Sequence, residues 1–227
     1  MSWIILTAVL ATGAESVVAE VSAAEALVRL SDEVQTGSLL VSRGDCVAVK
    51  VYSASALTHV AAVVVEDEKI LVYDATGGAG VRKQFLSDYL VGLRDARLHP
   101  FHPVKPLSEK QKRCFEQHLE SQLGRPYAIK HHLTGNRARG LHCSEYVTDA
   151  LMAAEILSAQ NPARVSPASL VEGALESGLY RSGESLELVL DFPDPPANQS
   201  WCGWLWFQTK ECTFACCRKM RGWIFCK

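Results

Sequence analysis

The chain has 227 residues, of which 48% are hydrophobic and 21% are charged. This composition supports a sizeable buried core and excludes a disordered acidic chain. Lys and Arg number 23 against 25 Asp and Glu, and the resulting net charge of −2 excludes a generally basic nucleic-acid binder. We therefore expect no nucleic-acid partner.

Composition divides the chain into four parts. We expect residues 1–35 to form an N-terminal segment with an amphipathic helix, and residues 36–190 to form the main folded domain. Residues 191–200 are rich in proline, which interrupts helices and favours an extended linker. Residues 201–227 form a basic tail that holds five of the eight cysteines and four of the five tryptophans.

The N-terminal segment is apolar but short. No apolar run reaches the roughly 18 uncharged residues that a transmembrane helix needs. The nearest approach, over residues 3–14, has the length of a signal-peptide core, but no basic side chain precedes it. We therefore favour a cytoplasmic or membrane-associated protein over a secreted one.

The first elements are a helix and a strand. Apolar residues recur at three- and four-residue steps over 14–33, which predicts an amphipathic helix that packs on the core. A break at Thr36-Gly37 precedes a short apolar run over 38–42, which predicts a strand. The segment 46–52 fits a helix or a strand equally well.

The middle of the domain predicts a buried β-hairpin. Two stretches rich in β-branched residues, His59–Val65 and Ile70–Asp74, flank the polar quartet 66–69. The glycine-rich turn over 77–80 lacks both the GxGxxG spacing and the lysine of a phosphate-binding loop. We therefore do not expect a nucleotide cofactor.

Three further helices follow. A capping-box pattern that begins at Ser108 predicts a helix that extends to Leu123. A broad apolar stripe predicts the next helix over 144–159. The segment Ser166–Leu170 opens the last, with proline at a position that suits the first turn of a helix.

Cys143 is a candidate nucleophile. It lies at the start of a predicted helix, where unsatisfied N–H groups and the helix dipole favour an anion and lower the pKa of a thiol. A lone cysteine is more often a small buried hydrophobe. However, His59 and Asp74 lie on the two strands of the predicted hairpin. There the carboxylate can orient an imidazole that accepts the proton of the thiol. The alternative for His59 is a strand-end histidine with no catalytic part.

Several short motifs in this chain suggest a family. In chain order they are TGSLLV at 36–41, THVAAVV at 58–64, VYDA at 72–75, GRPY at 124–127, HCSEYV at 142–147 and SPASL at 166–170. Together they resemble the circularly permuted papain-like, or permuted NlpC/P60 (YiiX/YebB-like), cysteine amidases and their acyltransferase relatives. The order fits the permuted branch, because His59 precedes Cys143, whereas the cysteine comes first in ordinary papain-like enzymes. The resemblance covers residues 36–172.

The resemblance implies an α+β fold in which a small antiparallel β-sheet or barrel packs against helices. It also implies Cys143 as the nucleophile, His59 as general base and then acid, and Asp74 as the orienting carboxylate. Many relatives have glutamate at this last position. Because aspartate is one methylene shorter, the strands must approach more closely or another residue must orient His59.

The resemblance further marks Tyr127, Ser144 and Glu145 as candidates for substrate or oxyanion contacts, together with the backbone N–H of Cys143. The implied reaction is cleavage of an amide or ester bond through a thioester on Cys143, with the acyl group passed to water or another acceptor. The implied substrates are peptides, peptidoglycan peptides and lipid acyl groups. No cofactor is implied.

Three histidines near the cysteine, His131, His132 and His142, could suggest a metal cluster. Structural zinc sites usually contain two close ligand pairs such as Cys-x2-Cys, and the spacing here offers only adjacent residues. We therefore expect no metal site in this domain.

The tail permits several interpretations. Its cysteines could form disulfides, bind a soft metal or carry acyl groups. Its tryptophans and basic residues suit a membrane interface, and the alternative is an extension without packed structure. The competing function for the whole chain is a non-catalytic papain-like binding module whose tail contacts a membrane or a partner.

Removal of residues 201–227 should leave a folded domain that still hydrolyses a soluble model substrate, because the proline-rich linker indicates few core contacts across the boundary. If the tail is a membrane element, the truncated chain should no longer sediment with anionic vesicles. Full-length protein that ignores such vesicles at low salt would contradict the membrane interpretation. A truncated chain that unfolds would contradict the boundary.

Overall fold

We describe the fold from a computed structural model, which defines residues 18–43, 55–93, 96–130, 134–137 and 139–189, together with Ser200 and Thr209. In chain order its elements are β1 (Ala19–Val21), α1 (Ala23–Glu33), β2 (Leu39–Arg43), β3 (Leu57–Glu66), β4 (Lys69–Thr76), β5 (Gly80–Phe85), α3 (Leu86–Gly92), β6 (Arg97–Pro103), α4 (Glu109–Ser121), α6 (Cys143–Ala153), a 3-10 helix η1 (Pro162–Arg164), α7 (Pro167–Glu176), β7 (Tyr180–Ser182) and β8 (Leu186–Leu188).

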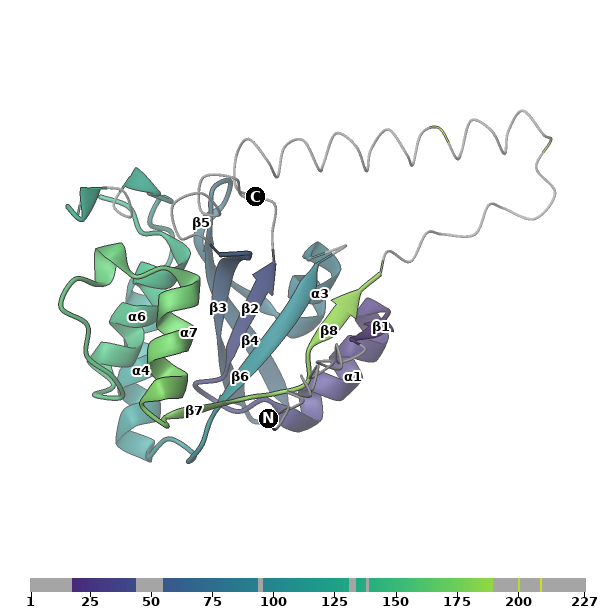
Figure 1. The fold of residues 1–227 in the computed structure, drawn as a ribbon, viewed down its shortest axis with the longest axis horizontal. Coiled ribbons are helices and arrows are strands. Elements are labelled where there is room, and N and C mark those ends of the chain that lie inside the picture. Colours follow the sequence, from purple (N-terminus) through teal and green to yellow (C-terminus); the bar gives the residue numbers. More distant parts are fainter. Residues whose placement is uncertain are drawn as a thin grey trace, which may run out of the picture.

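The strands form one open sheet of eight strands in the order β1-β8-β6-β2-β3-β4-β5, with β7 paired to β6. All neighbours are antiparallel except β1 and β8. Helices α4, α6 and α7 cover one face, and α1 and α3 cover the other (Figure 1). The α+β class is therefore confirmed, but the sheet is larger than the small sheet or barrel that the sequence predicts.

Strand β3 lies in the interior of the sheet, between β2 and β4, and is buried on both faces. Its alternate residues Val60, Ala62 and Val64 belong to the core beneath α4, α6 and α7. The intervening Ala61 and Val63 belong to the core beneath α1 and α3. Burial on both faces explains why the sequence is a nearly continuous apolar run rather than an alternating one.

The predicted hairpin and two helix starts are confirmed. Strands β3 and β4 join through Asp67 and Glu68, within the polar quartet. Ser108 forms the predicted capping box with the third residue of α4, and Ser166 caps α7 with proline in its first turn.

Two predicted helices are too long. The N-terminal helix begins only at Ala23, because Ser22 caps it and the residues before it pair with β8 as strand β1. The helix predicted over 144–159 begins at Cys143 and ends at Ala153. Glu155, two residues beyond this end, adopts a positive φ of 55°.

Elements β5, α3, β6, η1, β7 and β8 were not predicted. The segment 46–52 and nearly all of the linker and tail lie outside the described residues, so their predictions stay untested. Within the described part of the chain, no helix is long and apolar enough to cross a membrane.

Gly80 joins two parts of the fold by close backbone contact. It has φ +71°, and a Cβ atom there would lie 2.4 Å from the carbonyl oxygen of Arg125. Gly80→Ala should therefore lower the free energy of unfolding by about 1–3 kcal/mol, measured by urea denaturation. Gly92→Ala is the matched control, since nothing lies within 4 Å of its added methyl group. Equal stability of both variants would contradict this account.

Candidate active site

Cys143 is the first residue of α6, and its side chain is only 3% exposed. Helix α6 packs on β3 and β4, and Cys143 joins the apolar core that these strands form. The imidazoles of His142 and His59 both interact with this thiol and favour its charged form. The structure thus brings the predicted nucleophile close enough to the predicted base for each to affect the other's pKa.

The register of β2 against β3 shifts just before His59. Ser42 pairs with His59, but the next residue of β2 pairs with Leu57. Thr58 is therefore the extra residue of a β-bulge. Bulges of this kind bend a strand, and this one lies directly before His59, near the start of β3.

Asp74 faces His59 from the adjoining strand, as the hairpin predicts. Tyr73 pairs with Ala62, so the alternation of side chains puts Asp74 and His59 on the same face of the sheet. The Oδ2 atom of Asp74 lies 3.3 Å from Nε2 of His59. The shorter carboxylate therefore reaches the imidazole directly.

Arg82, which the sequence did not mark, holds the other side of this carboxylate. It pairs with Asp74 across β4 and β5, and its Nε donates to Oδ1 at 2.8 Å while Nη2 donates to Oδ2 at 3.2 Å. The carboxylate is only 1% exposed. Burial alone would raise the pKa of Asp74, but the hydrogen bonds from His59 and Arg82 lower it below its ordinary value.

The thiol and the imidazole stabilise each other's charge. Burial alone would raise the pKa of Cys143, but its interactions with the imidazoles of His142 and His59 lower it to about 5. Burial alone would lower the pKa of His59, but hydrogen bonds with Asp74 and Cys143 raise it to about 10. The favoured state near neutral pH is therefore a thiolate–imidazolium pair. Because Nε2 of His59 faces Asp74, Nδ1 is left for the thiolate.

His142 is the second residue that sequence reasoning missed. It is fully buried and caps α6, with Nδ1 accepting from the backbone N–H of Glu145 at 3.3 Å. Its Nε2 lies 2.8 Å from the carbonyl oxygen of Ala163 and donates to it. Its sequence signals were its place directly before a predicted helix and its position in the HCSEYV motif. This histidine fixes the start of α6 and with it the position of Cys143.

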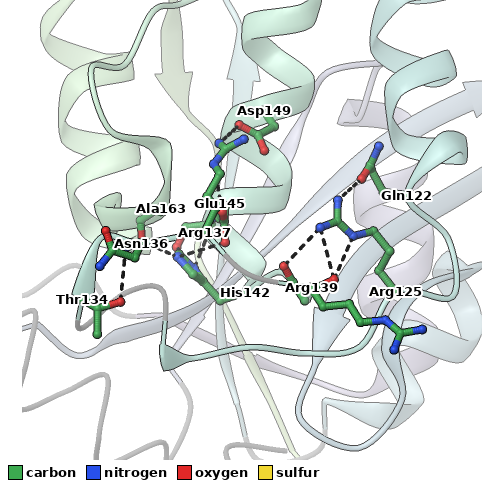
Figure 2. A network of polar contacts seen from close by, with 12 residues as sticks. Gln122, Arg125, Thr134, Asn136, Arg137, Arg139, His142, Glu145, Asp149 and Ala163 are labelled. Carbon is green, nitrogen blue, oxygen red and sulfur yellow. Dashed lines mark hydrogen bonds and ion pairs between the residues drawn. The ribbon is translucent and has the colours of Figure 1, made fainter.

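Ser144 and Glu145 make internal contacts. The hydroxyl of Ser144 lies 3.3 Å from Nδ1 of His142, and both side chains are buried. Glu145 pairs with Nε of Arg137 at 3.2 Å, and the same guanidinium contacts Asp149 one helical turn later, as Figure 2 shows. The suggested part of Ser144 and Glu145 in substrate contact stays a prediction.

Tyr127 lies beside the segment that leads into α6, where it forms an isolated parallel bridge with Leu141. Arg125 ties the two segments together, because its guanidinium donates to the backbone carbonyls of Arg139 and Gly140 (Figure 2). Burial and the nearby charge of Cys143 raise the pKa of Tyr127, so its hydroxyl stays protonated and able to donate. The oxyanion role of Tyr127 stays a prediction.

The described part of the chain contains no group of three or more His, Cys, Asp or Glu side chains that could hold a metal ion. His131 and His132 lie outside the described residues.

Comparison with known proteins gives little guidance. No known protein family matches the sequence, and no curated protein does. Among solved structures, the chain is similar to one titled "Crystal structure of metalloprotein yiiX from Escherichia coli O157:H7, DUF1105". The two chains share 19% sequence identity with a TM-score of 0.44, over 74% of this chain and 98% of that one. A likeness of this strength carries no argument about the site.

The ion pair predicts an acid-shifted thiol. Alkylation of Cys143 by iodoacetamide should rise with pH through about 5, since the thiolate forms as pH passes the lowered pKa, and should already be near its plateau at pH 7. Peptide mass spectrometry measures the rate, with Cys114 of α4 as an internal control in the same digest. A profile that rises only near the ordinary pKa of a thiol would contradict the ion pair.

Proposed function

We propose that this protein is a cysteine-dependent hydrolase or acyltransferase of the permuted papain-like (NlpC/P60) type, which cleaves an amide or ester bond through a thioester on Cys143. One observation carries the proposal: Nε2 of His59 lies 3.3 Å from the buried carboxylate of Asp74, and the same imidazole interacts with the thiol of Cys143 at the start of α6. A helix that presents a cysteine to antiparallel strands with the histidine, in the order histidine then cysteine, supports the permuted fold.

In the first step the thiolate of Cys143 attacks the carbonyl carbon of the substrate and forms a C–S bond. The tetrahedral oxyanion then collapses, and the bond to the leaving amine or alcohol breaks. His59 already carries a proton in the resting pair, so it donates that proton to the leaving group.

In the second step the neutral imidazole of His59 takes a proton from water or from an acceptor alcohol or amine. The activated oxygen or nitrogen attacks the thioester, the C–S bond breaks, and the thiolate–imidazolium pair is restored. Asp74 remains ionised throughout, since its pKa is lowered, and stabilises the imidazolium whenever it forms.

Two donors are suited to the oxyanion. The backbone N–H of Cys143 belongs to the first turn of α6, where N–H groups have no intrahelical acceptor. The second is the protonated hydroxyl of Tyr127, whose pKa is raised by burial and by the charge of Cys143. A substrate carbonyl held between them would receive two hydrogen bonds as its oxygen becomes negative.

Peptides, peptidoglycan peptides and lipid acyl groups remain the proposed substrate classes, because the resemblance in sequence supports each of them. Contact of the 201–227 tail with a membrane would favour the lipid class. That tail lies outside the described residues except for Thr209, so the vesicle experiment decides the matter.

A covalent intermediate tests the proposal. Incubation with p-nitrophenyl acetate should add one acetyl group to Cys143 of the full chain, detected by intact mass and removed by hydroxylamine as expected for a thioester. Cys143→Ala should abolish this label, and His59→Ala should slow its formation by about 10²–10⁴-fold. Asp74→Asn should lower turnover while leaving the circular dichroism spectrum unchanged.

Cys114→Ala serves as the matched control and should acetylate normally, since that half-buried thiol has no part in the pair. Acetylation of Cys143 no faster than that of Cys114 would instead support a non-catalytic binding module.

A further inference from the structure

The buried carboxylate of Asp74 is shared between two side chains. Arg82 approaches it with two parallel N–H groups, at 2.8 Å to Oδ1 and 3.2 Å to Oδ2. His59 approaches the same Oδ2 at 3.3 Å. One side chain on β4 therefore joins β5 to β3, and the oxygen that faces the imidazole is also held by the arginine.

The two-point contact fixes the plane of the carboxylate. A planar guanidinium matches both oxygens at once, whereas a lysine ammonium offers a single point charge. With one oxygen held by Nε and the other by Nη2, rotation of the Asp74 carboxylate would break at least one hydrogen bond. This restraint matters for aspartate, because its short side chain has little freedom to reach the imidazole in another way.

The charge of Arg82 is the weaker part of its contribution. Its side chain is 41% exposed, so water screens it, whereas the carboxylate is 1% exposed. Geometry rather than charge is what an exposed guanidinium can give to a buried site.

We propose that Arg82 is a positioning residue, which holds the Asp74 carboxylate in the orientation that lets it hydrogen-bond with His59. This inference rests on the proposed function, because it assigns Arg82 a part in preparing the Cys143–His59 pair.

The groups that surround His59 set its protonation. Asp74 faces it from β4, Cys143 from α6, and Arg82 lies beyond Asp74 on β5. Tyr89 of α3 is buried near Asp74 and Arg82, and burial and the Asp74 charge raise the pKa of its hydroxyl, which therefore stays neutral. Arg82 can be changed without altering a member of the catalytic series.

Two variants separate geometry from charge. Arg82→Lys keeps the positive charge but loses the two-point contact with the carboxylate, and Arg82→Gln loses both the charge and that contact. If Arg82 positions Asp74, both variants weaken the Asp74–His59 contact, so the pKa of His59 falls and that of Cys143 rises. If Arg82 acts by charge alone, Arg82→Lys behaves as wild type, and loss of a nearby cation in Arg82→Gln raises the pKa of His59. The direction of the His59 shift therefore distinguishes the two.

The experiment uses the full chain and needs no substrate. The pKa of Cys143 comes from the pH profile of iodoacetamide alkylation, and that of His59 from the ¹⁵N chemical shifts of its imidazole, assigned with His59→Gln. We expect a shift of about one unit for each group in both Arg82 variants, which corresponds to about fivefold slower alkylation at pH 5. Lys83→Gln is the matched control, because Lys83 is the next residue of β5, faces the other side of the sheet and pairs with Glu120.

The outcomes are separable. Wild-type Cys143 that reacts no faster than Cys114 overturns the proposed function. Wild-type Cys143 that reacts as expected while Arg82→Lys retains both wild-type pKa values overturns the positioning role and leaves the proposed function standing. Urea denaturation of each variant checks the fold, and Arg82→Lys decides the question if Arg82→Gln does not fold.

Discussion

The charged carboxylate of Asp74, buried between two strands, is the interaction on which the candidate site depends. A carboxylate removed from water stays ionised only if donors replace the lost hydration, and here His59 and Arg82 supply them from the strands on either side. The same negative charge stabilises the imidazolium of His59, which in turn stabilises the thiolate of Cys143. The reactivity of a thiol on a helix is therefore set by the pairing of three strands.

Much of the fold follows from the sequence because local signals and tertiary contacts agree there. The β3–β4 hairpin combines β-branched residues with a polar turn, and α4 and α7 begin at serine caps. Local sequence signals fail to predict strands whose pairing partners lie far away in the sequence. Val21 fits the spacing of a helix, yet it joins β1 because Leu188 pairs with it from far along the chain. Strand β5 carries charged side chains and has no apolar run, so only its ladder with β4 defines it.

The site was predictable to the same extent. The hairpin put Asp74 near His59, and the start of a predicted helix marked Cys143 as a candidate nucleophile, which the family resemblance supported. Arg82 was missed because its strand was missed. His142 was missed for a different reason, since helix caps are ordinarily Ser, Thr, Asp or Asn, and an imidazole in that position resembles a metal ligand more than a cap.

The short turn over 77–79 constrains the evolution of this sequence. Its residues are exposed and can be replaced with little effect on packing, but its length sets which side chains of β5 face Asp74. One residue gained or lost there would turn Arg82 to the opposite face. It would also displace the backbone of Val81, which exchanges hydrogen bonds with Gly124 and Arg125 beside Tyr127. Lineages of this protein should therefore vary this turn in composition but conserve its length.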